Sequence, residues 1–170
     1  MSKTALAMFK GAQQMKGAIQ EIQGGSLANS KISVMIQSKF LHQGEFKEEI
    51  ANELAYHPND VSADIFNAWL VQAPPFEVPN LGEVVVAGPL ANELMHQPQG
   101  QGLVEALIGY GLTKSRARHY EQEVSTGHWL VLIQTDQEKI NKLANTLSSY
   151  GGRDIEKWST KIEHAIHRLG

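Results

Sequence analysis

Apolar residues repeat along this chain in two patterns that together predict a β-α-β unit near its start. The run TALAMF (4–9) is typical of a buried strand, and KISVMIQ (31–37) alternates as a half-buried strand does. The helix expected between them carries its apolar residues on one face: Ala12, Met15, Ile19 and Ile22. Gly24 and Gly25 are expected to end this helix in the left-handed conformation that glycine accepts. Residues 4–37 are therefore predicted to form one β-α-β half.

A second unit with the same order of elements is predicted near the other end. Trp129–Gln134 is an apolar strand, and Thr135 with Glu138 has the spacing of a capping box at a helix start. The apolar stripe of that helix is Ile140, Leu143, Ala144 and Leu147. Gly151 is expected to end the helix, and Arg153–Trp158 can then form a closing strand.

The repetition of strand, helix and strand in 4–37 and 129–158 predicts an α+β fold. Two such halves usually pair into one antiparallel four-stranded sheet with both helices on one face, the ferredoxin-like split β-α-β arrangement. We expect a single domain over 1–170, with a helical and Pro-rich insertion over 38–128. An amphipathic helix over 160–169 is predicted to close the chain.

The insertion is too long to be a loop, and its pattern predicts mostly helices. One is expected over 45–56, and a second carries Ile65, Phe66 and Trp69. The segment QAPPFEVPNLG (72–82) holds three of the six prolines and is expected to be irregular.

The rest of the insertion is predicted to alternate short elements and turns. EVVVAG (83–88) indicates a short strand, and Pro89 is expected at the first position of a helix. A polar loop, His96–Gly102, leads to another short helix. Thr113 is expected to cap a final helix that Gly127 ends.

Composition excludes several classes of function. The chain has 170 residues, no cysteine and a formal net charge of -3, so thiol chemistry is excluded and nucleic acid is not expected as a partner. No apolar stretch reaches the roughly 20 residues that span a bilayer, and no targeting segment is evident. We therefore expect a cytoplasmic protein that does not associate with membranes.

Motifs that would carry catalysis or nucleotide binding are absent from the sequence. Neither Gly100-Gln101-Gly102 nor Gly109-Tyr110-Gly111 belongs to a dinucleotide fingerprint or a phosphate-binding loop, and no serine lies in a nucleophile elbow. We therefore predict no catalytic residues and no cofactor.

Seven histidines raise the question of metal binding. His164 and His167 lie three residues apart, and Glu53 and His57 lie four apart, spacings at which two side chains on a helix can share a metal. Di-metal bundles need two Glu-x-x-His motifs and two further glutamates, which the sequence does not supply. We predict no metal site, but an enzyme or metal protein using histidines with Tyr120, Glu121 or Glu163 stays open as the alternative.

One helix, predicted after Thr113, combines a basic cluster with a tyrosine. Glu121 and Glu123 on the same helix would repel phosphate, which argues against a DNA-reading role. Tyr120 lies on the apolar stripe, where its ring can be buried while its hydroxyl finds a partner. The candidate ligand-binding residues are Arg116, His119, Tyr120 and Glu121. A cleft beside the loop His96–Gly102 is a second candidate site.

Several short motifs between Val84 and Trp158 resemble a known family. They are Ala87-Gly88-Pro89-Leu90, Gly111-Leu112, Ala117 with Tyr120-Glu121, Val124 with Gly127, Leu130–Ile133, and Gly151 to Ile155. This order is similar to that of the bacterial general stress proteins with the heat-induced stress protein domain. That family tends to carry a Gly/Ala-rich stretch before the Ala-Gly-Pro-Leu segment, whereas this chain has a Glu-rich helix and the Pro-rich segment there. The resemblance implies stress-linked expression in the cytoplasm, and no known reaction or catalytic residue.

The function expected from the sequence is therefore that of a stress-associated module without enzymatic activity, which self-associates or binds a small ligand or a protein. A four-stranded sheet leaves two edge strands, and free edges invite pairing between subunits, so a homodimer is predicted.

Overall fold

Six strands form one antiparallel sheet in the computed structural model, which describes residues 2–41 and 76–160. Their order across the sheet is β3-β4-β2-β5-β1-β6. The strands are β1 (Ser2–Phe9), β2 (Lys31–Gln37), β3 (Phe76–Val78), β4 (Gly82–Ala87), β5 (Trp129–Asp136) and β6 (Arg153–Ser159). The longest pairing joins β1 to β5, where all eight residues from Ser2 to Phe9 have partners.

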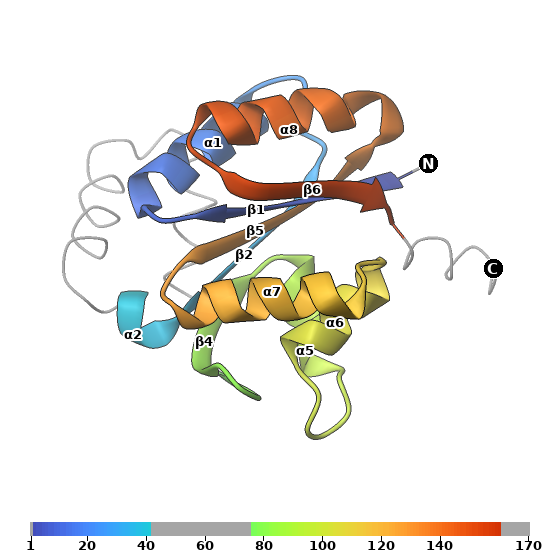
Figure 1. The fold of residues 1–170 in the computed structure, drawn as a ribbon. Coiled ribbons are helices and arrows are strands. Elements are labelled where there is room, and N and C mark those ends of the chain that lie inside the picture. The colour runs from blue at the N-terminus through green and yellow to red at the C-terminus, as the bar shows by residue number, and fades with distance from the viewer. Residues whose placement is uncertain (1, 42–75, 161–170) are drawn as a thin grey trace.

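Helices cover both faces of this sheet, so the protein has three layers (Figure 1). On one face lie α1 (Ala12–Gly24) and α8 (Ile140–Ser149), the latter preceded by the short 3₁₀ turn η1 (Gln137–Lys139). On the other face lie α5 (Pro89–Met95), α6 (Leu103–Tyr110) and α7 (Lys114–Ser125). A single turn, α2 (Ser38–Leu41), follows β2.

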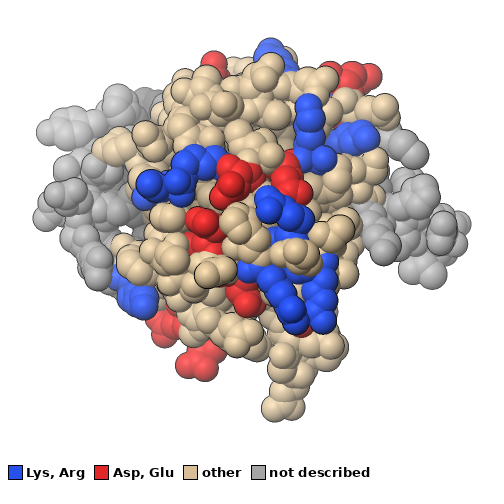
Figure 2. All heavy atoms as spheres, viewed as in Figure 1, with Lys and Arg blue, Asp and Glu red and all other residues tan. Residues whose placement is uncertain are grey.

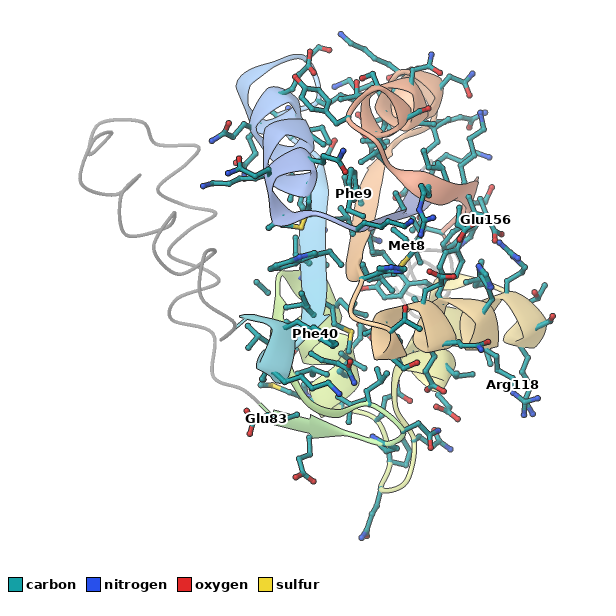
Figure 3. All side chains as sticks on the ribbon, turned by 60° about the vertical axis from the view of Figure 1, so that its left-hand side comes forward. Met8, Phe9, Phe40, Glu83, Arg118 and Glu156 are labelled. Carbon is teal, nitrogen blue, oxygen red and sulfur yellow. The ribbon has the colours of Figure 1, made fainter. Side chains whose placement is uncertain are left out.

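Each strand divides its side chains between two hydrophobic cores. In β1, Phe9 is buried with α1 and α8, whereas its neighbour Met8 is buried with α5, α6 and α7 (Figure 3). In β5, Ile133 likewise belongs to the core with α1 and α8, and Leu132 to the core with α5, α6 and α7. Strands buried on both faces read as continuous apolar runs rather than alternating ones, which explains the sequences TALAMF and WLVLI.

The α+β class and both terminal β-α-β units expected from the sequence are confirmed. β1, α1 and β2 form the first, and β5, α8 and β6 form the second. Their four strands lie together in the order β6-β1-β5-β2, and α1 and α8 share one face. The described part of the insertion also confirms the predicted strand (β4) and the three helices after it (α5, α6 and α7).

The insertion is not purely helical, and the prediction of an irregular segment over 72–82 is wrong for its described part, residues 76–82. β3 lies within that segment and pairs with β4, which in turn pairs with β2, so the insertion widens the sheet from four strands to six. Pro79 does not prevent this because it directly follows the three-residue edge strand, where proline is tolerated. Asn80 and Gly82, both at positive φ, then turn the chain into β4.

Two helix ends differ from the sequence predictions. The capping box of Thr135 and Glu138 does not form, because Thr135 belongs to β5 and its hydroxyl accepts a hydrogen bond from Ser30 at 2.9 Å. α1 ends at Gly24 as expected, but Gly25 is extended (φ −123°) rather than left-handed. In contrast, Thr113 caps α7 by accepting from the Arg116 backbone N–H, and Pro89 is the first residue of α5.

The predicted helices over 45–56 and around Ile65, and the terminal helix beyond Thr160, lie outside the described residues. Among residues 2–41 and 76–160, no helix has the length and apolar character needed to cross a membrane.

Candidate functional site

Charged and polar side chains gather where α7 runs alongside β6. We call this group the α7–β6 cluster. Its members are Arg116, His119, Tyr120, Glu123, His128, Arg153, Asp154 and Glu156. α7 buries Ala117, Tyr120 and Val124 against the sheet, so the residues between them face outward and toward β6. Acidic and basic side chains consequently mix in the middle of this face of the molecule (Figure 2).

Tyr120 is the buried centre of the cluster. Its side chain is fully buried, and its hydroxyl donates to the backbone carbonyl of Asp154 and lies 3.0 Å from Glu156 Oε1. Burial, together with the negative charge of Glu156, raises the pKa of Tyr120 far above its usual value. The phenol therefore stays protonated and acts as a hydrogen-bond donor that ties α7 to β6, not as a general base.

Arg116 forms an ion pair with Glu156 above the Tyr120 ring. The Arg116 Nε donates to Glu156 Oε1, and the guanidinium carbon lies 5.4 Å from the ring centroid. The hydrogen bond to Glu156 raises the pKa of Arg116. Glu156 occupies a position on the β6 edge above α7 (Figure 3). Arg116 thus already has a carboxylate partner and is not a free anion-binding group.

The two histidines of the cluster each contact a carboxylate. His119 Nε2 lies 3.2 Å from Asp154 Oδ2, and His128 Nδ1 lies 2.7 Å from Glu123 Oε2. Asp154 has a left-handed backbone (φ 52°), which aspartate tolerates better than most residues. One ligand atom from each of His119, Glu123 and Asp154 can be chosen so that all three lie within 4.8 Å of one another.

Glu121, the fourth ligand-binding residue expected from the sequence, is not part of this cluster. It lines a small cavity of about 170 Å³ with Asn80, Glu105 and Arg118. Burial and the nearby Glu105 raise the pKa of Glu121. The sequence placed Tyr120 and Glu121 together because they are neighbours, but adjacent residues on a helix point in different directions.

Five members of the cluster were not anticipated as site residues. Glu123 had a detectable signal, since it lies four residues after His119 on the same helix. Arg153, Asp154 and Glu156 gave none, because the pairing of β6 with β1 is what brings them to α7. His128 was missed although it lies five residues after Glu123, just beyond the end of α7.

The cleft expected beside His96–Gly102 exists. It measures about 700 Å³ and lies between the β3–β4 turn and the loop that joins α5 to α6. Most residues of its lining are apolar or carry a side-chain amide: Val78, Pro79, Asn80, Leu94, Met95, Gln97, Pro98, Gln99 and Gln101. Glu77 and three glycines, Gly82, Gly100 and Gly102, complete the lining. Met95 is 60% exposed and is the one large hydrophobic residue exposed among those the structure describes.

Comparison of the chain with family models, with curated proteins and with solved structures finds no match. The resemblance to general stress proteins therefore remains a prediction.

Proposed function

We propose that this protein is a binding module without enzymatic activity and that its ligand occupies the cleft beside the α5–α6 loop. The observation that supports this is the cleft itself, about 700 Å³ of open surface cavity at the position where the sequence led us to expect a site. The α7–β6 cluster supports the non-enzymatic reading, because Arg116 and Tyr120 are already bonded to residues of β6.

The cleft lining suits an extended peptide. Asn80, Gln97 and Gln101 carry side-chain amides, which both donate and accept hydrogen bonds as a peptide backbone requires. Leu94 and Met95 offer an apolar surface for an anchoring side chain, and Glu77 is the one charged residue in the lining. We propose a neutral or basic peptide with one apolar anchor.

Selection from a displayed library of random heptapeptides tests this proposal. We expect enrichment of peptides that share one apolar position and lack acidic residues. Met95→Glu should weaken a selected peptide at least tenfold, because it places a charge where the anchor binds. Asn92→Glu makes a matched change on the same helix at an exposed position outside the lining and should leave binding unchanged. Failure to enrich any sequence, or equal binding by Met95→Glu, would contradict the proposal.

We further propose that the four strands of the terminal halves constitute a ferredoxin-like sheet, with β3 and β4 added at one edge. Its support is the order β6-β1-β5-β2 with antiparallel neighbours, and the two crossover helices on one face. This arrangement is what two β-α-β halves give when each strand of one half pairs with strands of the other.

A role in the stress response of a bacterial cell, in the cytoplasm, is proposed from the resemblance alone. The motif Ala87-Gly88-Pro89-Leu90 that carries it forms the junction between β4 and α5. Quantitative proteomics of source cells before and after heat or salt shock tests this role: unchanged abundance under both conditions would contradict it.

A further inference from the structure

Three side chains of the α7–β6 cluster offer the kinds of atom that divalent metals bind. His119 supplies an imidazole nitrogen, and Glu123 and Asp154 supply carboxylate oxygens. His119 and Glu123 are four residues apart on α7 and so lie on the same side of that helix. Asp154 belongs to the neighbouring strand β6. The three residues thus come from two elements that the hydrophobic core fixes relative to each other.

The distances are close to those of a metal site. Ligand atoms around a tetrahedral Zn²⁺, each about 2.0–2.1 Å from the ion, lie roughly 3.3 Å apart. His119 Nε2 and Asp154 Oδ2 are already 3.2 Å apart, and the three ligand atoms lie within 4.8 Å of one another. Movement of the Glu123 carboxylate closer to the other two ligand atoms would complete the set.

Neighbouring residues orient two of these ligands. The hydroxyl of the buried Tyr120 donates to the backbone carbonyl of Asp154. His128 contacts the Glu123 carboxylate at 2.7 Å, as an outer-shell partner does in metal sites. The side chains of His119 and Asp154 are 34% and 39% exposed, which leaves a path for an ion to enter.

One cation competes for the same carboxylate. The Arg153 guanidinium lies 3.8 Å from Glu123 Oε2, whereas Arg116 is paired with Glu156 further along β6. A metal would replace the Arg153 contact on Glu123, so removing this arginine should favour the ion.

We propose that His119, Glu123 and Asp154 bind one divalent transition-metal ion. A set of one imidazole and two carboxylates suits Zn²⁺, since imidazole favours the later transition metals over Mg²⁺ and Ca²⁺. The fourth position of a tetrahedral ion would be open to water.

Calorimetric titration of the full chain, freed of any affinity tag and of metal, with Zn²⁺ at neutral pH tests the proposal. We expect one site of micromolar or tighter affinity that His119→Ala and Asp154→Asn each weaken at least tenfold. Asn accepts the left-handed backbone at position 154, so this variant removes charge without forcing the strand to rearrange. Arg153→Ser should bind several-fold more tightly than the wild type.

Matched controls are His96→Ala and Glu121→Gln, which remove an imidazole and a carboxylate from described positions outside the cluster. Both should bind Zn²⁺ as the wild type does, and circular dichroism should confirm that every variant is folded. The proposal is overturned by the absence of binding. It is equally overturned by a site that His119→Ala and Asp154→Asn leave unchanged, which would place the metal on other histidines.

Discussion

Tyr120 shows how one residue serves the packing of two elements at once. Its ring lies in the core beneath α7, and its hydroxyl is bonded to the start of β6. A buried phenol must place its hydroxyl against a partner, and here that partner is the carbonyl of a residue with an unusual backbone.

Replacing Tyr120 by phenylalanine measures this link. Tyr120→Phe keeps the ring and loses the hydrogen bonds to Asp154 and Glu156, so the free energy of unfolding should fall by about 1 kcal/mol in urea denaturation. Tyr150→Phe is the control: its hydroxyl bonds Glu21 at the surface, and the change should stay within about 0.5 kcal/mol. Equal effects of the two changes would contradict the role assigned to Tyr120.

Glu121 gives a prediction about pH. Its pKa is raised in the folded state by burial and by Glu105, so between its ordinary and its raised pKa the native state binds more protons than the unfolded state. Stability must therefore fall as pH rises through that window, and the loss persists at neutral pH.

Glu121→Gln should accordingly raise the free energy of unfolding at pH 7 by up to about 0.5 kcal/mol, the usual range for surface changes. The gain should disappear below about pH 4, where glutamate is protonated in both states. Denaturation curves at both pH values check this. The exposed Glu138→Gln serves as the control and should show no such pH-dependent gain.

At the scale of elements, the junction of β4 and α5 depends on Gly88. A Cβ at this position would lie 2.2 Å from the Ile32 carbonyl oxygen and 2.8 Å from Ser33 Cα, and φ is +92°. The close approach lets the Ser33 hydroxyl of β2 accept a hydrogen bond from the Leu90 backbone N–H at 3.0 Å. This bond gives a partner to an N–H group at the start of α5.

Gly88→Ala should therefore lower the free energy of unfolding by about 3 kcal/mol or more, since strain and a backbone clash add. Gly82→Ala separates the two causes: its φ is +72°, but nothing lies within 4 Å of the added Cβ. That change should cost only about 1–2 kcal/mol. Thermal or urea unfolding of both variants gives the comparison, and similar losses would show that the clash at Gly88 is relieved.

At the scale of the whole molecule, the two edges of the sheet decide how copies could pair. Two molecules could pair through β6, with the two β6 strands antiparallel and related by a two-fold axis. In such a pair, residues that lie opposite each other must be on the same face of the sheet. If the axis passes through Glu156 or Lys157, that residue lies opposite the same residue of the second copy. If the axis passes through Ile155, Asp154 lies opposite Glu156 of the second copy. Like charges directly opposite are destabilising, so β6 resists pairing with itself in these three registers.

The other edge is blunted in a different way. β3 is three residues long, its middle residue is Glu77, and Pro79 follows it without a backbone N–H to donate. The homodimer stays a prediction, which sedimentation of a concentration-independent 18.8 kDa species would contradict. Neither edge gives it the support that free strands were expected to give.

The charges of β6 can be tested directly. The double variant Glu156→Val/Lys157→Val removes the facing like charges, so its sedimentation mass should exceed that of the wild type at equal concentration. Glu138→Val/Lys142→Val makes the same charge change at exposed helical positions away from the edge and should match the wild type. An unchanged mass for the β6 variant would mean that charge is not what prevents pairing.

The sequence alone determined which segments become strands and helices in the two terminal units. Apolar runs such as Leu130–Ile133, and glycines such as Gly151 at positive φ, act through local geometry that any three-dimensional context must respect. The surface position of the loop His96–Gly102 was also foreseeable, because a polar loop between helices must lie there.

Only the tertiary structure decided how the elements meet. Short-range pattern could not show that β3 and β4 widen the sheet, because strand pairing depends on residues far apart in the chain. For the same reason the pattern missed Asp154 and Glu156 as partners of α7. The α7–β6 cluster exists because one hydrophobic core packs α7 on the face of the sheet whose edge strand is β6, and no local sequence signal encodes that contact.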